Sequence, residues 1–234
     1  MVANLLRKKR TTYVSILISS LLIFIYLSAS TQRNQLTFLD VYLLNLSEQL
    51  SAPLFEDIFS FVTLFGSVEL IAILSIFLLS FLLFKKKDFR MIAAFITIMA
   101  GSVLANFILK LVFQRERPGE TSYFEVFGFT IELASYSFPS GHTMRACIFY
   151  GFLIYLIYHY QIYQSKGKQI AAASLFGLIL AVGFSRVYLD AHFPSDIVAA
   201  FYASLALFML FLLSIDRFKI REQDRTIIKN NENG

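Results

Sequence analysis

The sequence predicts an all-α integral membrane protein whose chain crosses the bilayer six times as transmembrane helices in one bundle. Its 234 residues are 57% hydrophobic and 16% charged, whereas soluble domains usually carry about a quarter of charged residues. The mean hydropathy is +0.64. The charged residues gather in blocks between long apolar stretches. Helices are expected throughout, because an open sheet edge would leave backbone groups without hydrogen-bond partners in lipid.

Six apolar stretches are long enough, or nearly so, to cross about 30 Å of hydrocarbon at about 1.5 Å per helical residue. They are residues 12–30, 58–84, 91–109, 142–163, 170–185 and 197–215. The first stretch follows a basic run at 7–10 and ends in small residues, which is also typical of a cleaved signal peptide. We favour a retained helix, because the apolar run is long for a signal core.

The basic blocks predict how these helices are oriented. With six spans, the blocks at 7–10, 85–90, 166–168 and 217–229 all fall on one side, and they hold most of the 21 lysines and arginines. The positive-inside rule makes that side cytoplasmic. We therefore predict a single domain over residues 1–234 in the cell membrane, with a core of about 58–215 and cytoplasmic tails at 1–11 and 216–234. This distribution argues against nucleic-acid binding, which needs basic residues along one polar face.

The opposite, extracytoplasmic ends of the last four spans hold an unusual set of polar residues. The set combines three cations, two histidines and a carboxylate in three short motifs: Lys110-x6-Arg117-Pro118, Pro139-Ser140-Gly141-His142 and Ser185-Arg186-x5-His192-x3-Asp196. Cations near hydrocarbon are costly and repel one another, so an anionic ligand is expected to offset them. A phosphate group is the natural candidate.

Two parts of this set suit a phosphate. Lys110 and Arg117 lie on one face if the helix continues for two turns. Arginine offers a planar fork to phosphate oxygens, and lysine offers a point charge. Ser140 and Gly141 stand just before a predicted helix, where free backbone N–H groups and a capping hydroxyl favour an anion.

The histidines can supply the nucleophile and the proton donor that covalent hydrolysis of a phosphate ester requires near neutral pH. His192 and Asp196 are four residues apart at a helix start. The carboxylate can therefore accept the proton of one ring nitrogen and leave the other nitrogen facing phosphorus. His142, on a different span, would then be the acid.

In this order and on this side of the membrane, the three motifs resemble the signature of the type 2 phosphatidic acid phosphatase superfamily. The resemblance implies that His192 is the nucleophile that forms a phosphohistidine, with Asp196 as its orienting partner and His142 as the general acid. It also implies no metal and no cofactor. The groups that it implies for holding the phosphate are Lys110, Arg117, Ser140, Gly141 and Arg186.

Three further residues lie inside apolar stretches. An ionisable residue there is a functional candidate. Arg145, one turn after His142, could contact a second phosphate or a headgroup, or it could pair with Glu69 or extend to the outer interface. Glu69 is expected to have a structural role. The single Cys147 is expected to be a small packed residue, and it excludes a disulfide framework.

Two segments outside the spans are expected to be structural. Residues 34–57 are predicted to form an amphipathic segment on the outer surface. Residues 114–138 are rich in phenylalanine and tyrosine and could be a lid over the site, although an interfacial connector is favoured.

Together these features predict an enzyme that removes phosphate from a membrane lipid. The leading substrates are undecaprenyl pyrophosphate and phosphatidylglycerol phosphate, and phosphatidic acid or a lipid A phosphate would also fit a site at the outer leaflet. A lipid phosphotransferase could resolve the same phosphohistidine with a lipid acceptor. An anion or lipid transporter would instead spread its cations through the membrane depth, whereas these cations cluster at one end.

Overall fold

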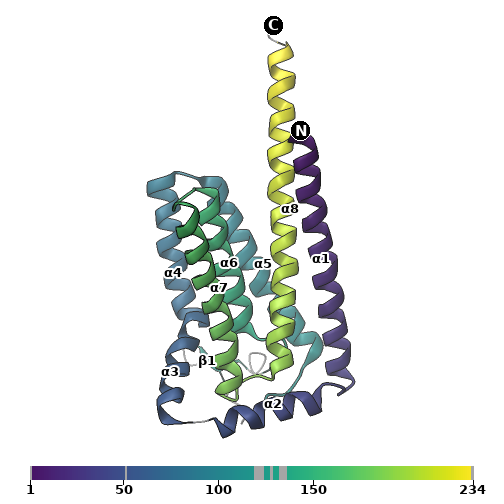
Figure 1. Cartoon of the computed structure of the whole chain (residues 1–234), viewed down its shortest axis with the longest axis vertical. Coiled ribbons are helices and arrows are strands. Elements are labelled where there is room, and N and C mark those ends of the chain that lie inside the picture. Colours follow the sequence, from purple (N-terminus) through teal and green to yellow (C-terminus); the bar gives the residue numbers. More distant parts are fainter. Residues whose placement is uncertain (1, 51, 119–123, 127–128, 132–135, 233–234) are drawn as a thin grey trace.

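The structure is a computed structural model that describes residues 2–50, 52–118, 124–126, 129–131 and 136–232, with side chains for 8–50, 52–118 and 136–216. The α-helices of these residues (Figure 1) are α1 (Val2–Gln32), α2 (Thr37–Gln49), α3 (Pro53–Thr63), α4 (Val68–Phe81), α5 (Phe89–Phe113), α6 (Gly141–His159), α7 (Ser165–Tyr188) and α8 (Pro194–Glu232). A 3-10 turn, η1 (Leu64–Gly66), precedes α4, and a π-helical turn, η2 (Leu82–Lys86), follows it. Between α5 and α6, the short strands β1 (Phe124–Val126) and β2 (Phe129–Ile131) pair antiparallel.

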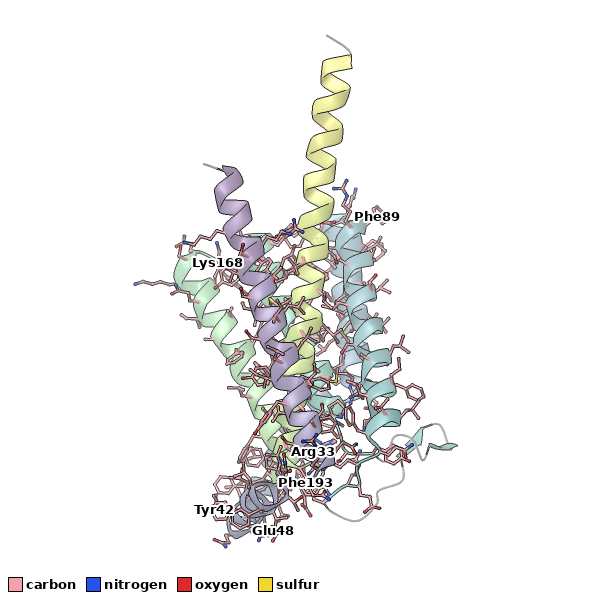
Figure 2. The ribbon with its side chains drawn as sticks, turned by 90° about the vertical axis from the view of Figure 1, so that its right-hand side faces the viewer. Arg33, Tyr42, Glu48, Phe89, Lys168 and Phe193 are labelled. Atoms are coloured by element: carbon pink, nitrogen blue, oxygen red, sulfur yellow. The ribbon has the colours of Figure 1, made fainter. Side chains whose placement is uncertain are left out.

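The long helices stand side by side, and two shorter helices lie at one end of them. In Figure 1, α1, α4, α5, α6, α7 and α8 follow the long axis, whereas α2 lies across their lower end with α3 beside it. Both termini lie at the upper end. Figure 2 shows Tyr42, Glu48 and Phe193 at the end where α2 lies, and Phe89 and Lys168 at the opposite end. The links from α5 to α6 and from α7 to α8 therefore both reach the end that carries α2.

Five helices are long and apolar enough to cross a membrane: Lys8–Gln32, Val68–Lys86, Phe89–Phe113, Ser165–Tyr188 and Pro194–Asp216. The chain is therefore a helical membrane protein, as predicted. The stretch at 142–163 forms α6, which is not among these five in the part of the chain that the structure describes. α6 packs against α5, α7 and α8 and buries most of its side chains. A sixth crossing by α6 stays a prediction.

One predicted boundary is wrong. The sequence predicts a single span over 58–84, but the structure breaks this stretch after Gly66. Ser67 begins α4 as its N-cap, because its hydroxyl accepts a hydrogen bond from the N–H of Leu70 at 3.1 Å. A Cβ added to Gly66 would lie 2.9 Å from the carbonyl oxygen of His142. Packing against the start of α6 fixes the break, and a hydropathy pattern cannot reveal such a tertiary contact.

The core of the bundle surrounds α6. Its large, fully buried apolar side chains come from η2, α5, α6 and α7 and include Leu82, Phe95, Ile148, Phe152 and Val182. Lipid tails are as apolar as these side chains, so helix association in a membrane depends on close packing and on buried hydrogen bonds. One such bond joins the Tyr150 hydroxyl, on α6, to the carbonyl oxygen of Phe65 at 2.9 Å.

α1 lies along α8 on the outside of this core. Near the termini, Lys9 Nζ lies 3.7 Å from Asp216 Oδ1. α8 continues to Glu232, so most of the segment predicted as a tail at 216–234 extends the last helix.

Candidate active site

The predicted site residues lie at four helix ends, all at the end of the bundle that carries α2. Lys110 is in the last turn of α5, and Arg186 is in the last turn of α7. Gly141 and His142 open α6, and Asp196 is in the first turn of α8. Arg117, Ser140 and His192 lie just outside these helices. The alternation of helix direction therefore brings together motifs that are separated in the sequence.

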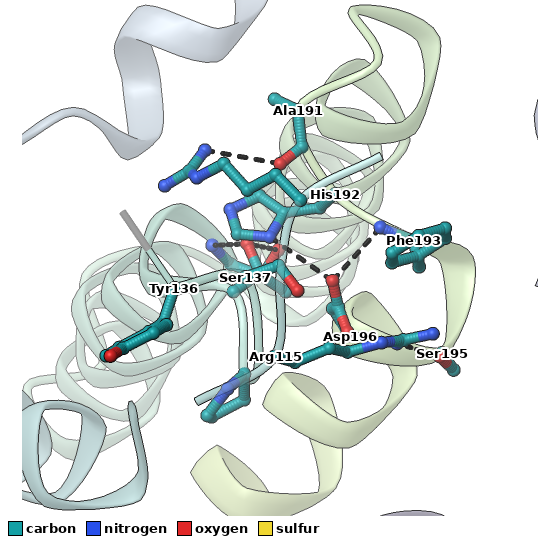
Figure 3. A network of polar contacts seen from close by, with 12 residues as sticks. Arg115, Tyr136, Ser137, Ala191, His192, Phe193, Ser195 and Asp196 are labelled. Carbon is teal, nitrogen blue, oxygen red and sulfur yellow. Dashed lines mark hydrogen bonds and ion pairs between the residues drawn. The ribbon is translucent and has the colours of Figure 1, made fainter. Parts of the chain in front are cut away.

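His192 and Asp196 face each other in the turn that leads into α8 (Figure 3). His192 Nδ1 lies 3.5 Å from Asp196 Oδ2, and both side chains are buried. The same carboxylate oxygen accepts a hydrogen bond from the N–H of Phe193 at 3.0 Å. Nδ1 faces the carboxylate but makes no hydrogen bond to it at this distance, and a backbone hydrogen bond with Ser137 also acts on the ring.

The surroundings of His192 favour its neutral form. Burial lowers the pKa of His192 well below its ordinary value of 6.5, and the charges of Arg117 and Arg186 lower it further. One ring nitrogen of His192 is therefore unprotonated near neutral pH, as a nucleophile or a base requires.

The predicted cations are held by neutral groups of the chain. Lys110 is 8% exposed and donates to the carbonyl oxygen of Tyr136. Arg117 Nη1 donates to the carbonyl oxygen of Ala191 at 3.2 Å. Arg186 Nη1 donates to Thr63 Oγ1 at 2.9 Å, while its buried Nε has no hydrogen-bond partner among the described residues.

These cations lie close enough to act on one another. Arg117 and Arg186 both interact electrostatically with Lys110 and with His142. Burial lowers the pKa of Arg117, and the negative charge of Asp196 opposes that shift. A cluster of buried like charges is unfavourable on its own, so its arrangement fits a site that receives an anion.

The loop before α6 is fixed against the other motifs. Ser140 caps α6, since its hydroxyl accepts hydrogen bonds from the N–H of Thr143 at 3.4 Å and from the Thr143 hydroxyl at 3.1 Å. Its own N–H donates to the carbonyl oxygen of Asp196 at 3.3 Å. Asn106 Nδ2 on α5 donates to the carbonyl oxygen of Pro139 at 3.0 Å. The helix start is thereby held beside the histidine and aspartate pair.

Arg145 lies against this loop. Its Nε donates to the carbonyl oxygen of Gly66 at 3.0 Å, and a Cβ added to Gly141 would lie 3.1 Å from its Nη1. The charge of Glu69 is close enough to act on Arg145. Arg145 therefore makes a structural contact at the break before α4, and it also borders the predicted phosphate site.

Several polar residues of the site were not predicted from the sequence, among them Arg115, Asp40, Ser195 and Ser137. Arg115, which lies two positions before Arg117, donates to Asp196 Oδ1 at 2.5 Å. Asp40 on α2 and Ser195 on α8 bind the same arginine. The sequence predicts a structural role for residues 34–57, and no local pattern marks Asp40 as buried. Among the described residues, no group of three or more histidine, cysteine, aspartate or glutamate side chains could hold a metal ion.

Helices able to cross a bilayer, with a histidine and aspartate pair among buried cations at one end, are the arrangement expected of an integral membrane phosphatase. The chain belongs to the PAP2 superfamily, whose match covers residues 91–220, more than half of the sequence. The family predicted from the three motifs is thereby confirmed.

Two curated relatives are lipid phosphatases. Phosphatidylglycerophosphatase B of Bacillus subtilis (strain 168) is 26% identical over 193 residues, which cover 82% of this chain and 91% of that protein. Lipid A 1-phosphatase of Rhizobium etli is 32% identical over 108 residues, which cover 45% of this chain and 41% of that protein. Both relatives to which the chain is similar are thus named as lipid phosphatases.

Two solved structures share the fold. The crystal structure of a transmembrane PAP2 type phosphatidylglycerolphosphate phosphatase from Bacillus subtilis matches with a TM-score of 0.75 and 25% identity, over 87% of this chain and 96% of that one. The crystal structure of Aquifex aeolicus LpxE matches with a TM-score of 0.56 and 22% identity, over 74% of this chain and 94% of that one. The second likeness concerns the fold alone.

Proposed function

We propose that the protein hydrolyses a phosphate ester on a membrane lipid without a metal, through a phosphohistidine formed on His192. The observation that carries this proposal is the buried contact between His192 Nδ1 and Asp196 Oδ2, at 3.5 Å. It turns Nδ1 toward the carboxylate, which makes Nε2 the nitrogen proposed to attack phosphorus, and the carboxylate is proposed to stabilise the positive charge that the ring acquires.

The proposed reaction has two displacements at phosphorus. In the first, Nε2 of His192 forms a bond to phosphorus while the bond from phosphorus to the lipid oxygen breaks. His142, protonated once the bound phosphate offsets the neighbouring cations, gives its proton to that oxygen. In the second, His142 takes a proton from water, whose oxygen attacks phosphorus. The phosphorus–nitrogen bond breaks, inorganic phosphate leaves and His192 returns to its neutral form.

The buried cations are proposed to hold the phosphate and to stabilise its charge in the transition state. Lys110, Arg117 and Arg186 act in this role together with Ser140 and Gly141 at the start of α6. The unpaired Nε of Arg186 supports the assignment, because a buried donor without a partner is costly and a phosphate oxygen would satisfy it.

We also propose that the site faces the extracytoplasmic side and that both termini are cytoplasmic. The exposed lysines between α4 and α5 (Lys85, Lys86 and Lys87) and the exposed Lys166 at the start of α7 belong to the end opposite the site, where the termini also lie. The positive-inside rule assigns that end to the cytoplasm.

For the substrate, we propose phosphatidylglycerol phosphate. The relative named phosphatidylglycerophosphatase B aligns over most of both chains, and this supports the choice. Undecaprenyl pyrophosphate is the second candidate. It is favoured by Arg145, an additional cation beside Gly141 that a second phosphate could reach.

The test is phosphate release from each lipid by the purified protein in detergent with excess EDTA. The variant His192→Ala is compared with His159→Ala, which alters the histidine at the far end of α6. We expect release by the parent and by His159→Ala, and none above background by His192→Ala. Loss of parent activity in EDTA, or retained activity in His192→Ala, would overturn the mechanism. The lipid with the higher kcat/KM identifies the substrate.

The same assay with an added lipid alcohol addresses the phosphotransferase alternative. A hydrolase releases inorganic phosphate at the same rate with or without the alcohol. A transferase instead forms a phosphorylated alcohol at the expense of free phosphate.

A further inference from the structure

α2 is a largely exposed helix whose few buried side chains include one carboxylate, Asp40. Asp40 is 1% exposed, whereas Phe38 and Tyr42 on either side are 84% and 57% exposed. A buried charge is unfavourable unless it is paired and hydrogen-bonded. The partners of Asp40 therefore explain why an acidic residue lies on the inner face of this surface helix.

Those partners belong to the start of α8 and to the chain that leaves α5. Asp40 Oδ1 accepts a hydrogen bond from the N–H of Ser195 at 2.9 Å. Asp40 Oδ2 accepts one from the Ser195 hydroxyl at 2.6 Å and one from Arg115 Nη2 at 2.7 Å. The carboxylate thus binds the N-terminus of α8, where negative charge is favourable, and one arm of an arginine fork.

The other guanidinium nitrogen of Arg115, Nη1, contacts Asp196 of the proposed catalytic pair. Arg115 Nη1 donates to Asp196 Oδ1 at 2.5 Å and to Ser195 Oγ at 2.7 Å. The guanidinium also lies 4.0 Å from the centre of the Phe193 ring. Figure 3 shows Arg115 and Ser195 beside Asp196, on the side away from the His192 ring.

This arrangement divides the two oxygens of Asp196 between two tasks. Oδ1 is bound by Arg115, whereas Oδ2 accepts a hydrogen bond from the N–H of Phe193 and faces His192 Nδ1. Without Asp40, both arms of Arg115 would be free to bind Asp196 in a bidentate pair, which is the preferred geometry of arginine with a carboxylate. Oδ2 would then turn toward the arginine and away from the histidine.

We propose that Asp40 is a positioning residue, which acts through Arg115 and Ser195 to keep Asp196 oriented toward His192. The surface helix α2 is thereby part of the machinery that prepares the nucleophile. This inference rests on the proposed function, since it takes His192 and Asp196 as the reacting pair.

The first test compares Asp40→Asn with Glu48→Gln, which makes the same change of charge at an exposed position of α2. For Asp40→Asn we expect kcat to fall roughly 10- to 100-fold, the usual range for groups that orient a catalytic residue. KM for the lipid is expected to stay within about twofold, because the groups proposed to hold the phosphate are unchanged. Glu48→Gln is expected to match the parent. Equal effects of the two variants would overturn the proposal.

The pH dependence of kcat/KM separates positioning from partial unfolding. Lys110, Arg117 and Arg186 already disfavour protonation of His192. Removing the negative charge of Asp40 leaves Arg115 less neutralised and weakens the carboxylate contact that stabilises the imidazolium. The acid limb is therefore expected to move to lower pH. Fewer folded molecules would reduce the amplitude and leave the limb in place, and that result would overturn the proposal.

A double-mutant cycle with Arg115→Gln tests the route of the effect. If Asp40 acts through Arg115, adding Asp40→Asn to Arg115→Gln causes less than about a threefold further loss, and independent contributions would multiply instead. If Asp40→Asn does not fold, Ser195→Ala gives the same comparison with all charges kept. The proposal would be overturned if the loss of activity in the double variant equalled the product of the losses in the two single variants. An inactive parent enzyme would instead be the failure of the proposed function.

Discussion

The two ends of the bundle carry the same kinds of cation in opposite environments. At the site end, Lys110 and Arg186 are largely buried and bind a carbonyl group and a hydroxyl of the chain. At the other end, Lys85 and Lys166 are exposed. Lys86, also exposed, lies 4.6 Å from the centre of the Tyr160 ring. The cost of burying a charge is therefore confined to one end.

The two sets of cations therefore have different roles, which cannot be distinguished in the sequence, where both are simply basic residues. Exposed cations remain hydrated, and their number on one side is enough to favour an orientation in the membrane. Buried cations are unfavourable until an anion arrives, so their individual geometry matters. We therefore expect activity to be sensitive to conservative changes of the buried cations at the site end and tolerant of such changes among the exposed cations at the opposite end.

The largest effect is expected for Arg186→Lys beside the matched change Arg10→Lys. Lysine cannot supply both the arm that binds Thr63 and the free Nε of the fork. We expect kcat/KM for phosphate release to fall on the order of 100- to 1,000-fold in Arg186→Lys, as for removal of one transition-state donor. Arg10, which is exposed, should tolerate the change. Similar activities for the two variants would contradict the comparison.

A smaller effect is expected when a methyl group is added at Gly66. Its Cβ would lie 2.6 Å from Val182 Cγ1, and Val182 is fully buried. Overpacking of this kind typically destabilises by about 1–3 kcal/mol. The control is Gly101→Ala on α5, where no atom lies within 4 Å of the added Cβ. Thermal inactivation in detergent measures both variants, and an unchanged midpoint for Gly66→Ala would show that the break before α4 can relax.

At the site end, burial also affects the protonation of His192. Its pKa is lowered by burial, so the folded chain resists a proton that the unfolded chain binds below about pH 6.5. Stability is then lost as the pH falls below that value. The sequence has three histidines, and NMR of labelled histidine can assign this one through His192→Asn. We expect its ring to stay neutral at pH 6, and a midpoint near 6.5 would contradict the electrostatic argument.

The three motifs could be predicted because each is local in the sequence and lies at the end of an apolar stretch. Such a stretch indicates where a helix meets the membrane boundary, so residues at 110, 142, 186 and 196 could be assigned to one side. The alternation of helices then brings them to one end of the bundle. No pairwise contact had to be known for this prediction.

The Asp40 network could not be predicted in the same way. Asp40 and Ser195 are 155 positions apart, and Asp40 and Arg115 are 75 apart. In the sequence, Asp40 is one polar residue of an amphipathic segment, and only the packing of α2 against the start of α8 buries it. The break at Gly66 was missed for the same reason, because α3 and α4 form one apolar stretch.

The smallest effect is expected for the ion pair near the termini. Lys9 and Asp216 lie 3.7 Å apart, with side chains 53% and 20% exposed. Pairs of this kind contribute about 0–1 kcal/mol. Lys9→Ala should therefore leave phosphate release unchanged and shift the inactivation midpoint by no more than about 2 °C at low salt, and less at high salt. A larger shift would mean that the ion pair between α1 and α8 contributes substantially to stability. The end with exposed cations would then also depend on the geometry of individual side chains, as the site end does.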